Sequence, residues 1–418
     1  MPTNFLTVAD ASKAIDVSPD TIRRWEKKGL IKAQRSDLNY RLFNLSEIAR
    51  IHAKVSGKKS GNNYKILKTS RKTPYSVVEL FAGAGGTALG LHNAGLQHVL
   101  LTDWDKDSIN TLRLNKPDWN VIHDDIRNVN FKGITADIVE GGFPCQTFSY
   151  AGKKMGFEDA RGTMFFEFAR AVKEIQPKIA MGENVRGLLN HDGGKTLSAI
   201  VEVLEDMGYR VAYKILRAQY LDVPQKRERL IILAVRGDLD IPICFPRERD
   251  YTISLREALE NCPSSEGQKY PQSKARILSK IPQGGYWRDL PLETQKEYMG
   301  ASYFHTGGRT GMARRLSWDE PSLTLTCAPA QKQTERCHPE ETRPLTISEY
   351  ARIQTFPDNW KFVGSTASKY KQIGNAVPSN LGFHIGQCMI AMLNNSIDPK
   401  SMEIVPVGEE VAFRSKAR

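Results

Sequence analysis

A cysteine, an acid and two arginines stand where the chain can turn at one edge of a sheet. Cys145 lies on a glycine- and proline-rich loop after an apolar strand, Glu183 follows the next such strand, and Arg227 and Arg229 precede a third. Open α/β sheets bind ligands beyond the carboxyl ends of their parallel strands, so these side chains should converge there. A thiol beside a carboxyl and guanidinium groups suits nucleophilic addition with proton donation and anion stabilisation. Since a single cysteine is more often a buried apolar side chain, the hypothesis depends on its partners.

The elements that must position these residues alternate between strand and helix. Residues 76–81 form a β-branched, apolar strand that breaks into a glycine turn at 82–86 and then a helix over 87–94. This alternation predicts a doubly wound α/β sheet. Further strands are predicted at 99–101, at a segment ending near Asp124, and at 137–140, 179–181, 211–216 and 229–235.

The glycine turn and the acid after the second strand indicate a bound nucleoside. Glycines allow backbone to approach a ligand, and Asp103, roughly twenty residues further on, can bind a pair of ribose hydroxyls. The turn lacks the full GxGxxG spacing, which disfavours a dinucleotide. The glycines alone are equally compatible with a purely structural turn.

Composition limits the class of protein. The chain has 418 residues, 40% of them hydrophobic and 25% charged, with a mean hydropathy of −0.43, as in globular proteins of two or three domains. No apolar run approaches the roughly eighteen residues of a membrane span, and the first residues lack a signal peptide, so a cytoplasmic protein without a membrane partner is expected. The six cysteines contain no CxxC pair, which disfavours a disulfide framework and a zinc ribbon. His305 and the Cys337-His338 pair are interpreted as structural, and no metal is expected.

The net charge of +12 is concentrated at the start of the chain. Residues 1–74 hold 16 Lys and Arg against 6 Asp and Glu, and the remaining residues hold 43 against 41. A basic segment joined to a near-neutral domain is typical of polyanion binding. A solvated basic tail is the alternative.

The basic segment is patterned as two short helices across a tight turn. One helix is predicted from Thr7 to about Ile15 and a second from Pro19 to Lys28, with Gly29 ending it. Residues 30–31 and 40–43 can pair as a wing. The stretch over about 5–52 resembles the MerR-like winged helix-turn-helix family, although a small helical packing domain remains open. The candidate DNA-binding residues on the second helix are Arg23, Arg24, Lys27 and Lys28.

Six blocks in the larger part of the chain resemble the DNA (cytosine-5) methyltransferases in both content and order, over residues 75–390. The resemblance implies a Rossmann-like S-adenosylmethionine-dependent methyltransferase fold, with a mixed, mostly parallel sheet, a reversed last strand and a C-terminal helix that completes the cofactor domain. Asp103 stands where the family often has Glu, and Asp124-Asp125-Ile126 where Gly-Asp-Ile is common. The blocks are residues 79–86, Gly142-Phe143-Pro144-Cys145-Gln146, Glu183-Asn184-Val185, Gln225-Lys226-Arg227-Glu228-Arg229, residues 343–358, and residues 372–378.

The resemblance implies a role for each site residue. Cys145 would add to carbon 6 of cytosine, Glu183 would protonate N3, Arg229 with Arg227 would hold O2, and Asn184 would orient the loop. No side chain is an obvious base for the carbon 5 proton, so water is considered. The residues expected to bind S-adenosylmethionine are Phe81, Gly83, Gly85, Gly86, Asp103, Trp104, Asp125, Ile126, Pro144 and Asn375.

Residues 237–337 lack the strand–helix alternation and combine glycines, arginines and aromatics. Such a surface suits reading of a DNA groove around a flipped-out base, and the resemblance implies a target-recognition region. An irregular insertion without base contacts is the alternative. The candidate DNA-binding residues here are Arg309, Arg314 and Arg315.

The expected organisation has six parts. They are a winged helix-turn-helix domain (1–52), a mobile basic linker (53–74), a catalytic and cofactor-binding domain (75–236), the target-recognition region (237–337), a returning catalytic part (338–395) and a tail (396–418).

The expected function is methylation of cytosine carbon 5 in duplex DNA, in a restriction-modification system, by a monomer on its target that can dimerise through the first domain. Two alternatives stay open at this point. They are an RNA cytosine-5 methyltransferase on the same scaffold and a DNA-binding regulator with a vestigial catalytic fold.

Overall fold

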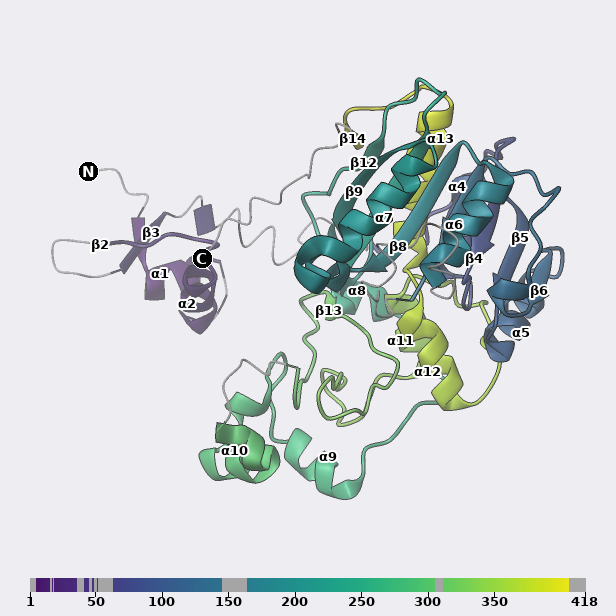
Figure 1. The fold of residues 1–418 in the computed structure, drawn as a ribbon. Coiled ribbons are helices and arrows are strands. Elements are labelled where there is room, and N and C mark those ends of the chain that lie inside the picture. Colours follow the sequence, from purple (N-terminus) through teal and green to yellow (C-terminus); the bar gives the residue numbers. More distant parts are fainter. Residues whose placement is uncertain are drawn as a thin grey trace. The chain divides into compact units, whose positions relative to one another are not determined.

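The computed structural model divides the chain into two compact units, Met1–Asn63 and Tyr64–Arg418, drawn as ribbons in Figure 1. Each unit is described by itself. Among the described residues, no helix is long and apolar enough to cross a membrane. The structure describes residues 5–15, 17, 19–35, 41–44, 47–48, 51, 63–144, 164–304 and 311–405.

The first unit packs two helices against a small antiparallel sheet of order β1-β3-β2. Ile22 and Trp25 of the second helix are buried in the core of this unit. The prediction for the wing was partly wrong: Gln34 and Arg35, not residues 30–31, pair with β3, because Ile31 is drawn into the core. A first strand that pairs with β3 was missed. The elements are β1 (Phe5–Thr7), α1 (Val8–Ala14), α2 (Pro19–Lys27), β2 (Gln34–Arg35) and β3 (Arg41–Asn44).

The second unit is built on a seven-stranded sheet of order β6-β5-β4-β7-β8-β11-β9. Only β11 runs antiparallel to its two neighbours, so the sheet is mixed and mostly parallel, with its last strand reversed as expected. Every predicted strand is present, most of them longer by one to four residues. The strands are β4 (Ser76–Leu80), β5 (Gln97–Asp103), β6 (Val121–His123), β7 (Ile138–Gly141), β8 (Ile179–Val185), β9 (Tyr209–Arg217) and β11 (Glu228–Arg236).

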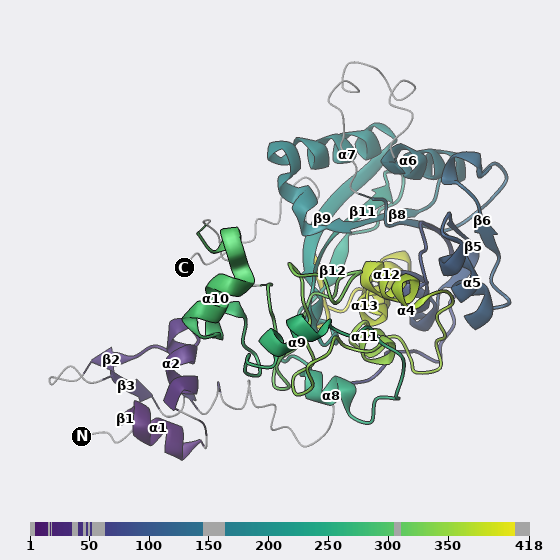
Figure 2. The same ribbon diagram turned by 90° about the horizontal axis from the view of Figure 1, so that it is seen from below.

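Helices cover both faces of this sheet, as the view in Figure 2 shows. Apolar side chains of α6 and α7 pack on one face, and those of α4 and α13 pack on the other. Helix α5 joins α4 in a neighbouring cluster with α11 and α12. The helices are α4 (Gly86–Ala94), α5 (Lys106–Asn115), α6 (Met164–Ile175), α7 (Lys195–Asp206), α11 (Ile347–Ile353), α12 (Thr366–Asn375) and α13 (Ser379–Leu393).

Glycines bring α4 and α13 into backbone contact. A Cβ atom on Gly86 would lie 2.2 Å from the carbonyl oxygen of Val377, and one on Gly90 would lie 2.3 Å from that of Ser379. Helix α13 therefore packs on α4, the first helix of the second unit. This confirms the expected C-terminal helix that returns to complete the catalytic fold.

The expected boundaries of the recognition region were too wide. Strand β12 pairs with β14 inside the main core, so residues before Tyr270 and part of the expected tail belong to the catalytic fold. A separate apolar cluster gathers buried residues from Tyr270 to Ala313 together with Cys337, whereas Leu316 and Leu325 pack in the cluster of α4 and α5. The remaining elements are η1 (Ile126–Asn128), η3 (Arg186–Gly194), η4 (Ala218–Tyr220), β10 (Gln225–Lys226), β12 (Cys244–Pro246), α8 (Leu255–Leu259), α9 (Gln272–Leu278), η5 (Trp287–Asp289), α10 (Leu292–Met299), η6 (Gly300–Phe304), β13 (Ser322–Leu323) and β14 (Met402–Ile404).

Residues 64–74 are part of the catalytic unit, although they were expected in the linker. The Tyr64 hydroxyl donates to the Arg352 carbonyl at 2.9 Å, and the Leu67 amide donates to Asn380 Oδ1 at 2.9 Å. Thr73 closes the run, its amide donating to the Gly95 carbonyl at 2.9 Å. The basic composition misled the prediction because the backbone, not the lysine side chains, makes several of these contacts.

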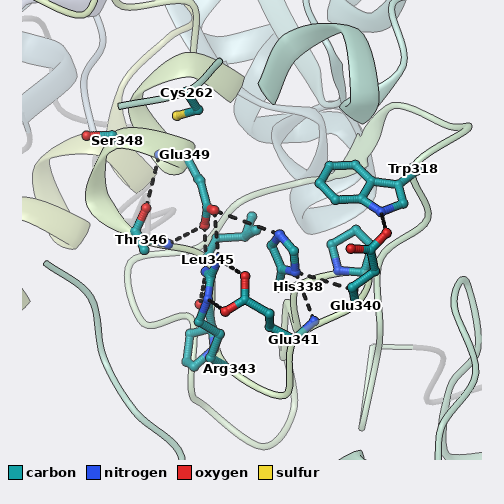
Figure 3. A network of polar contacts seen from close by, with 12 residues as sticks. Cys262, Trp318, His338, Glu340, Glu341, Arg343, Leu345, Thr346, Ser348 and Glu349 are labelled. Atoms are coloured by element: carbon teal, nitrogen blue, oxygen red, sulfur yellow. Dashed lines mark hydrogen bonds and ion pairs between the residues drawn. The ribbon is translucent and has the colours of Figure 1, made fainter. Parts of the chain in front are cut away.

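A polar network holds the segment that returns from the recognition region to α11 (Figure 3). Arg343 donates to both oxygens of Glu349, at 2.8 and 2.9 Å, and Glu349 also accepts from the Thr346 amide in a capping box. His338 Nδ1 accepts from the Glu340 and Glu341 amides, at 3.3 and 3.1 Å. The imidazole therefore secures a tight turn of the backbone.

Candidate functional site

A cavity of about 650 Å³ opens at the carboxyl edge of the sheet. Its size suits a nucleoside-sized ligand with room for a second ring. Its lining comes from early and late parts of the second unit's sequence. The strand ends and the glycine turn contribute to it, and so does the segment between α12 and α13. The predicted residues that line it are Phe81, Gly83, Gly86, Asp103, Trp104, Asp125, Ile126, Pro144, Glu183, Asn184, Arg227, Arg229 and Asn375.

Glu183 and Arg229 form an ion pair at this edge. Glu183 Oε1 lies 2.7 Å from Arg229 Nε, and the two side chains are only 13% and 11% exposed. Strand β11 runs antiparallel beside β8 with Ile231 opposite Glu183, so Arg229 projects on the same face, one pleat further on. A largely buried carboxyl and guanidinium are thereby held together within the cavity.

Asn184 holds the strand end that leads to the cysteine loop. Its Nδ2 donates to the Phe143 carbonyl at 2.9 Å and its side chain is buried. Pro144, the next residue, is exposed and lines the cavity. Cys145 itself lies outside the described residues, so its thiol is not located.

Arg227 stands behind the cavity wall, where the prediction had placed it at a substrate oxygen. The side chain is 1% exposed, and its Nη2 donates to the carbonyls of Gly374 at 3.1 Å and Ala376 at 2.9 Å. Burial, with the Arg229 charge beside it, lowers the pKa of Arg227 to about 9. Arg227 therefore joins the segment between β10 and β11 to the C-terminal end of α12 through hydrogen bonds.

Asp103 anchors the glycine turn. Its two carboxylate oxygens accept from the amides of Gly83 and Asp105, each at 2.8 Å. Burial raises the pKa of this carboxyl. Phe81, with φ of 57°, begins the turn in a left-handed conformation.

Gly85 does not line the described cavity, although it was predicted among the cofactor residues. It caps α4 with φ of 87°, and a Cβ atom there would lie 2.6 Å from Leu112 Cδ2 and 3.2 Å from Trp360. Glycine is needed at this position for conformation and packing.

The rim of the cavity carries an exposed aromatic face and two ion pairs. Trp104 is 74% exposed, and Lys371 Nζ lies 6.0 Å from its ring centre while pairing with Asp105 at 2.9 Å. Asp125 pairs with Arg127 at 2.5 Å, which lowers the pKa of Asp125 to about 2. The rim thus offers a flat ring for stacking beside fixed charges.

Sequence reasoning missed Lys371 and Glu140 in the cavity wall. Lys371 directly precedes the 372–378 block and is basic, so its position was a usable signal. Glu140 ends an apolar strand just before the cysteine loop, and a charged residue there was a signal as well.

The candidate DNA-contacting residues divide into exposed and buried ones. Arg23, Arg24, Lys27 and Lys28 are all exposed on α2, and Arg23 pairs with Asp20 at 2.7 Å. In the recognition region Arg314 is half-buried, with its guanidinium 5.6 Å from the Tyr286 ring centre. Arg309 lies outside the described residues.

Arg315 does not face the surface, contrary to the prediction. It is 4% exposed and donates to backbone carbonyls of three separate segments, among them Ile281 at 2.8 Å, Leu278 at 2.8 Å and His338 at 3.0 Å. Loops without strand or helix partners leave many carbonyls unpaired, and a guanidinium with five donors can satisfy them. The buried guanidinium of Arg315 therefore holds the loops of the recognition region together through hydrogen bonds to their backbone.

Comparison with known proteins bears on both units. Residues 75–391 match the model of the C-5 cytosine-specific DNA methylases, and residues 7–43 match that of the MerR family regulatory proteins. The chain is 54% identical over 403 residues to the Type II methyltransferase M.Eco47II of Escherichia coli, covering 93% of this chain and 96% of that protein. It is 50% identical over 406 residues to the Type II methyltransferase M.PspPI of a Psychrobacter species, covering 94% and 97%.

Solved structures share the fold. A variant of DNMT2 from Spodoptera frugiperda aligns with a TM-score of 0.55 at 16% identity, covering 76% of this chain and 99% of that one. The Entamoeba histolytica methyltransferase EhMeth aligns with a TM-score of 0.52 at 16% identity, covering 78% and 100%. With its cavity, its mixed sheet and these relatives, the chain belongs to the C-5 cytosine-specific DNA methylase family and is a DNA (cytosine-5) methyltransferase.

Proposed function

We propose that the cavity binds S-adenosylmethionine and a flipped-out cytosine together, and that Cys145 is the nucleophile of the reaction. The observation that carries this proposal is the buried Glu183–Arg229 ion pair in the cavity wall. Glu183 lies on β8, and the neighbouring strand β7 leads into the Cys145 loop. Asn184 holds the residues after β7 through its hydrogen bond to the Phe143 carbonyl.

The thiolate of Cys145 adds to carbon 6 of the cytosine. As the carbon–sulfur bond forms, the electron pair of the C5=C6 bond becomes a C4=C5 bond, the pair of the C4=N3 bond moves to N3, and N3 takes a proton from the Glu183 carboxyl. Arg229 holds O2 and the charge that develops there. After transfer of the methyl group, a base removes the carbon 5 proton and the thiolate leaves. Water is the candidate for this base.

The residues of the cavity fit S-adenosylmethionine, which supplies the electrophilic methyl group. The Gly83 Cα has open space around it, and its amide is fixed by Asp103. Asp103 would bind the ribose hydroxyls, Trp104 an adenine face, and Ile126 with Asp125 the adenine edge. Phe81, Gly86 and Asn375 would approach the methionine part.

The proposed substrate is double-stranded DNA, with the enzyme acting as a monomer without a metal ion in the cytoplasm, where host DNA is found. The likeness to Type II methyltransferases supports a role in protecting host DNA in a restriction-modification system. The recognition region that clusters from Tyr270 to Cys337 would read the bases around the target.

The first unit is proposed to read an operator and repress the transcription of its own gene, as a monomer or as a dimer. The exposed basic face of α2 supports groove binding, because Arg24, Lys27 and Lys28 project away from the buried Ile22 and Trp25.

A Cys145→Ser variant tests the catalytic proposal. It is expected to keep its affinity for DNA and for S-adenosylmethionine while losing methylation of duplex DNA by roughly 10³-fold or more, because a hydroxyl is a far weaker nucleophile than a thiolate. The measurement is transfer of a labelled methyl group, followed by bisulfite sequencing of the product.

Duplex DNA with 5-fluorocytosine at the target provides the control. Fluorine cannot leave as a proton does, so the wild type is expected to be trapped as a covalent adduct and Cys145→Ser is not. Methylation by the variant near the wild-type rate, or preferential methylation of transfer RNA by the wild type, would contradict the proposal.

A further inference from the structure

Three glutamates lie side by side across the catalytic sheet. Glu79 of β4 is directly opposite Glu140 of β7, and Met181 of β8, opposite Glu140, is two residues before Glu183. Residues two apart on a strand share a face, so all three carboxyls project from the same face of the sheet. The Glu183 carboxyl reaches over the next pleat of β7, with its Oε2 3.2 Å from the position of a Cβ atom on Gly142.

The two outer carboxyls have cationic or imidazole partners and the middle one has none. Glu79 Oε2 lies 3.0 Å from His98 Nε2, and Glu183 Oε1 lies 2.7 Å from Arg229 Nε. Among the described residues no hydrogen bond or ion pair to Glu140 is found, and Glu79 Oε1 likewise has no hydrogen-bond partner there. It is 2% exposed and lines the cavity. Burial without a cationic partner among the described residues favours the protonated form of this carboxyl.

Two physical effects act on Glu140 in the same direction. Burial and the neighbouring charges of Glu79 and Glu183 raise its pKa well above the ordinary value of a glutamate. The other charged groups that line the cavity, besides Glu183 and Arg229, are Asp103, Asp105, Asp124, Asp125, Arg127, Arg227 and Lys371. Arg229 pairs with Glu183 and not with Glu140, so Glu140 is the member of the pair in which burial and like charge favour the protonated form.

We propose that Glu140 stores the proton which Glu183 delivers to N3 of the cytosine. When Cys145 adds to carbon 6, the proton of Glu140 passes to Glu183, directly or through one water, and from Glu183 to N3, which leaves both carboxyls ionised. When the thiolate is eliminated, N3 returns the proton to Glu183 and Glu183 returns it to Glu140, so no proton is consumed. Glu140 thus acts through Glu183, by holding the proton that Glu183 passes on. The inference rests on the proposed role of Glu183.

A Glu140→Gln variant separates this role from simple packing. The amide keeps the shape of the side chain but holds no transferable acid proton, so Glu183 must be protonated from solvent. The single-turnover methylation rate of the variant relative to the wild type is therefore expected to fall as the pH rises, by up to about tenfold for each pH unit, because the solvent then supplies fewer protons. At lower pH the two rates are expected to converge. A packing defect would instead lower the rate by the same factor at every pH.

Glu79→Gln is the matched control, because Glu79 is the same residue type on the other side of Glu140 and does not line the cavity. This variant removes a charge that helps to raise the pKa of Glu140 but leaves the acid proton of Glu140 in place, so its rate relative to the wild type is expected to change with pH much less than that of Glu140→Gln. The affinity of each variant for S-adenosylmethionine and S-adenosylhomocysteine, measured by calorimetry, is expected to match that of the wild type.

Three outcomes would overturn the proposal. The first is a Glu140→Gln rate ratio that does not change with pH. The second is a loss of preference for S-adenosylmethionine over S-adenosylhomocysteine, which would make Glu140 a partner of the cofactor's positive charge. The third is a wild-type infrared spectrum without the carbonyl band of a buried protonated acid near neutral pH, a measurement that needs no variant to fold. If instead Glu183→Gln methylates like the wild type, the proposed role of Glu183 fails, and the storage role with it.

Discussion

At the scale of single residues, Glu183 must satisfy two opposed requirements. Its ion pair with Arg229 stabilises the charged carboxylate, whereas donation to N3 requires the acid. A neutral amide at this position would still donate a hydrogen bond but could not complete a proton transfer.

This conflict predicts a graded response to substitution. Glu183→Gln is expected to retain part of the activity, and Glu183→Ala is expected to lose roughly 10²–10⁴-fold, the usual contribution of one acid–base group. The measurement is the single-turnover rate of methyl transfer to a duplex containing the target. An alanine variant as active as the wild type would remove Glu183 from the mechanism.

Residue types and spacing were enough to place Glu183 and Arg229 at one edge of the sheet, where the structure brings them together, whereas Cys145 stays a prediction. Cys145, Glu183 and Arg229 could be selected because strand ends of a parallel sheet meet at one edge, a rule that needs no side-chain contacts. Arg227 and Arg315 were misjudged because charge suggests exposure, and only the tertiary structure reveals the unpaired carbonyls that these guanidiniums satisfy. Glu140 was missed because its closeness to Glu79 and Glu183 depends on the register of neighbouring strands, which the sequence alone does not give.

At the scale of elements, the recognition region depends on one buried side chain more than on regular structure. Arg315 bridges the α9 end, the turn after it and the His338 turn. Arg315→Met keeps most of the volume but removes all five donors, and is expected to lower the free energy of unfolding by about 3 kcal/mol. The expected consequence is loss of affinity for target DNA with little change in affinity for S-adenosylmethionine, whose site lies in the other part of the unit.

Arg314→Met is the neighbouring control for thermal or urea unfolding. Its half-buried guanidinium lies against the Tyr286 ring, and its Nε has no hydrogen-bond partner among the described residues, so the free energy of unfolding is expected to change by less than about 1 kcal/mol. Equal destabilisation by the two substitutions would refute the organising role of Arg315.

Strands and helices of the catalytic unit were predictable from periodicity and glycine positions, but the short pairings were not. Strands β1, β2 and β12 have two or three residues each, and their partners lie elsewhere in the chain. Local sequence carries little information on such pairing, because it is decided by the tertiary contacts that bring the partner close.

At the scale of the whole molecule, the boundary between the two units decides how they can be separated. A chain beginning at Tyr64 keeps the contacts of residues 64–74 with the catalytic unit, whereas one beginning at Tyr75 loses them. The longer chain is expected to methylate the same target sequence at a rate within about threefold of full length, since non-specific phosphate contacts alone are lost. The shorter one is expected to unfold at a temperature several degrees lower, in line with the loss of a few buried hydrogen bonds.

Footprinting of DNA upstream of the gene tests whether the first unit acts by itself. Full-length protein is expected to protect an operator there, and the chain beginning at Tyr64 is not. Full-length protein with Arg23→Ala and Arg24→Ala is the control, since both side chains are exposed on α2 and lie outside the catalytic unit. Protection by the truncated chain, or methylation of a different sequence by it, would show that the first unit is not a separate operator reader.

The packing of α13 on α4 has a consequence for the timing of synthesis. The apolar side chains of Leu91 and Ala94 are covered by Leu381 and Ile385, which the ribosome adds roughly 290 residues later. At ordinary translation rates this interval lasts on the order of 15 to 60 s, during which the nascent sheet exposes one apolar face. Chaperones have access to that face throughout, and methylation in a cell that has just acquired the gene begins only after the last helix has closed.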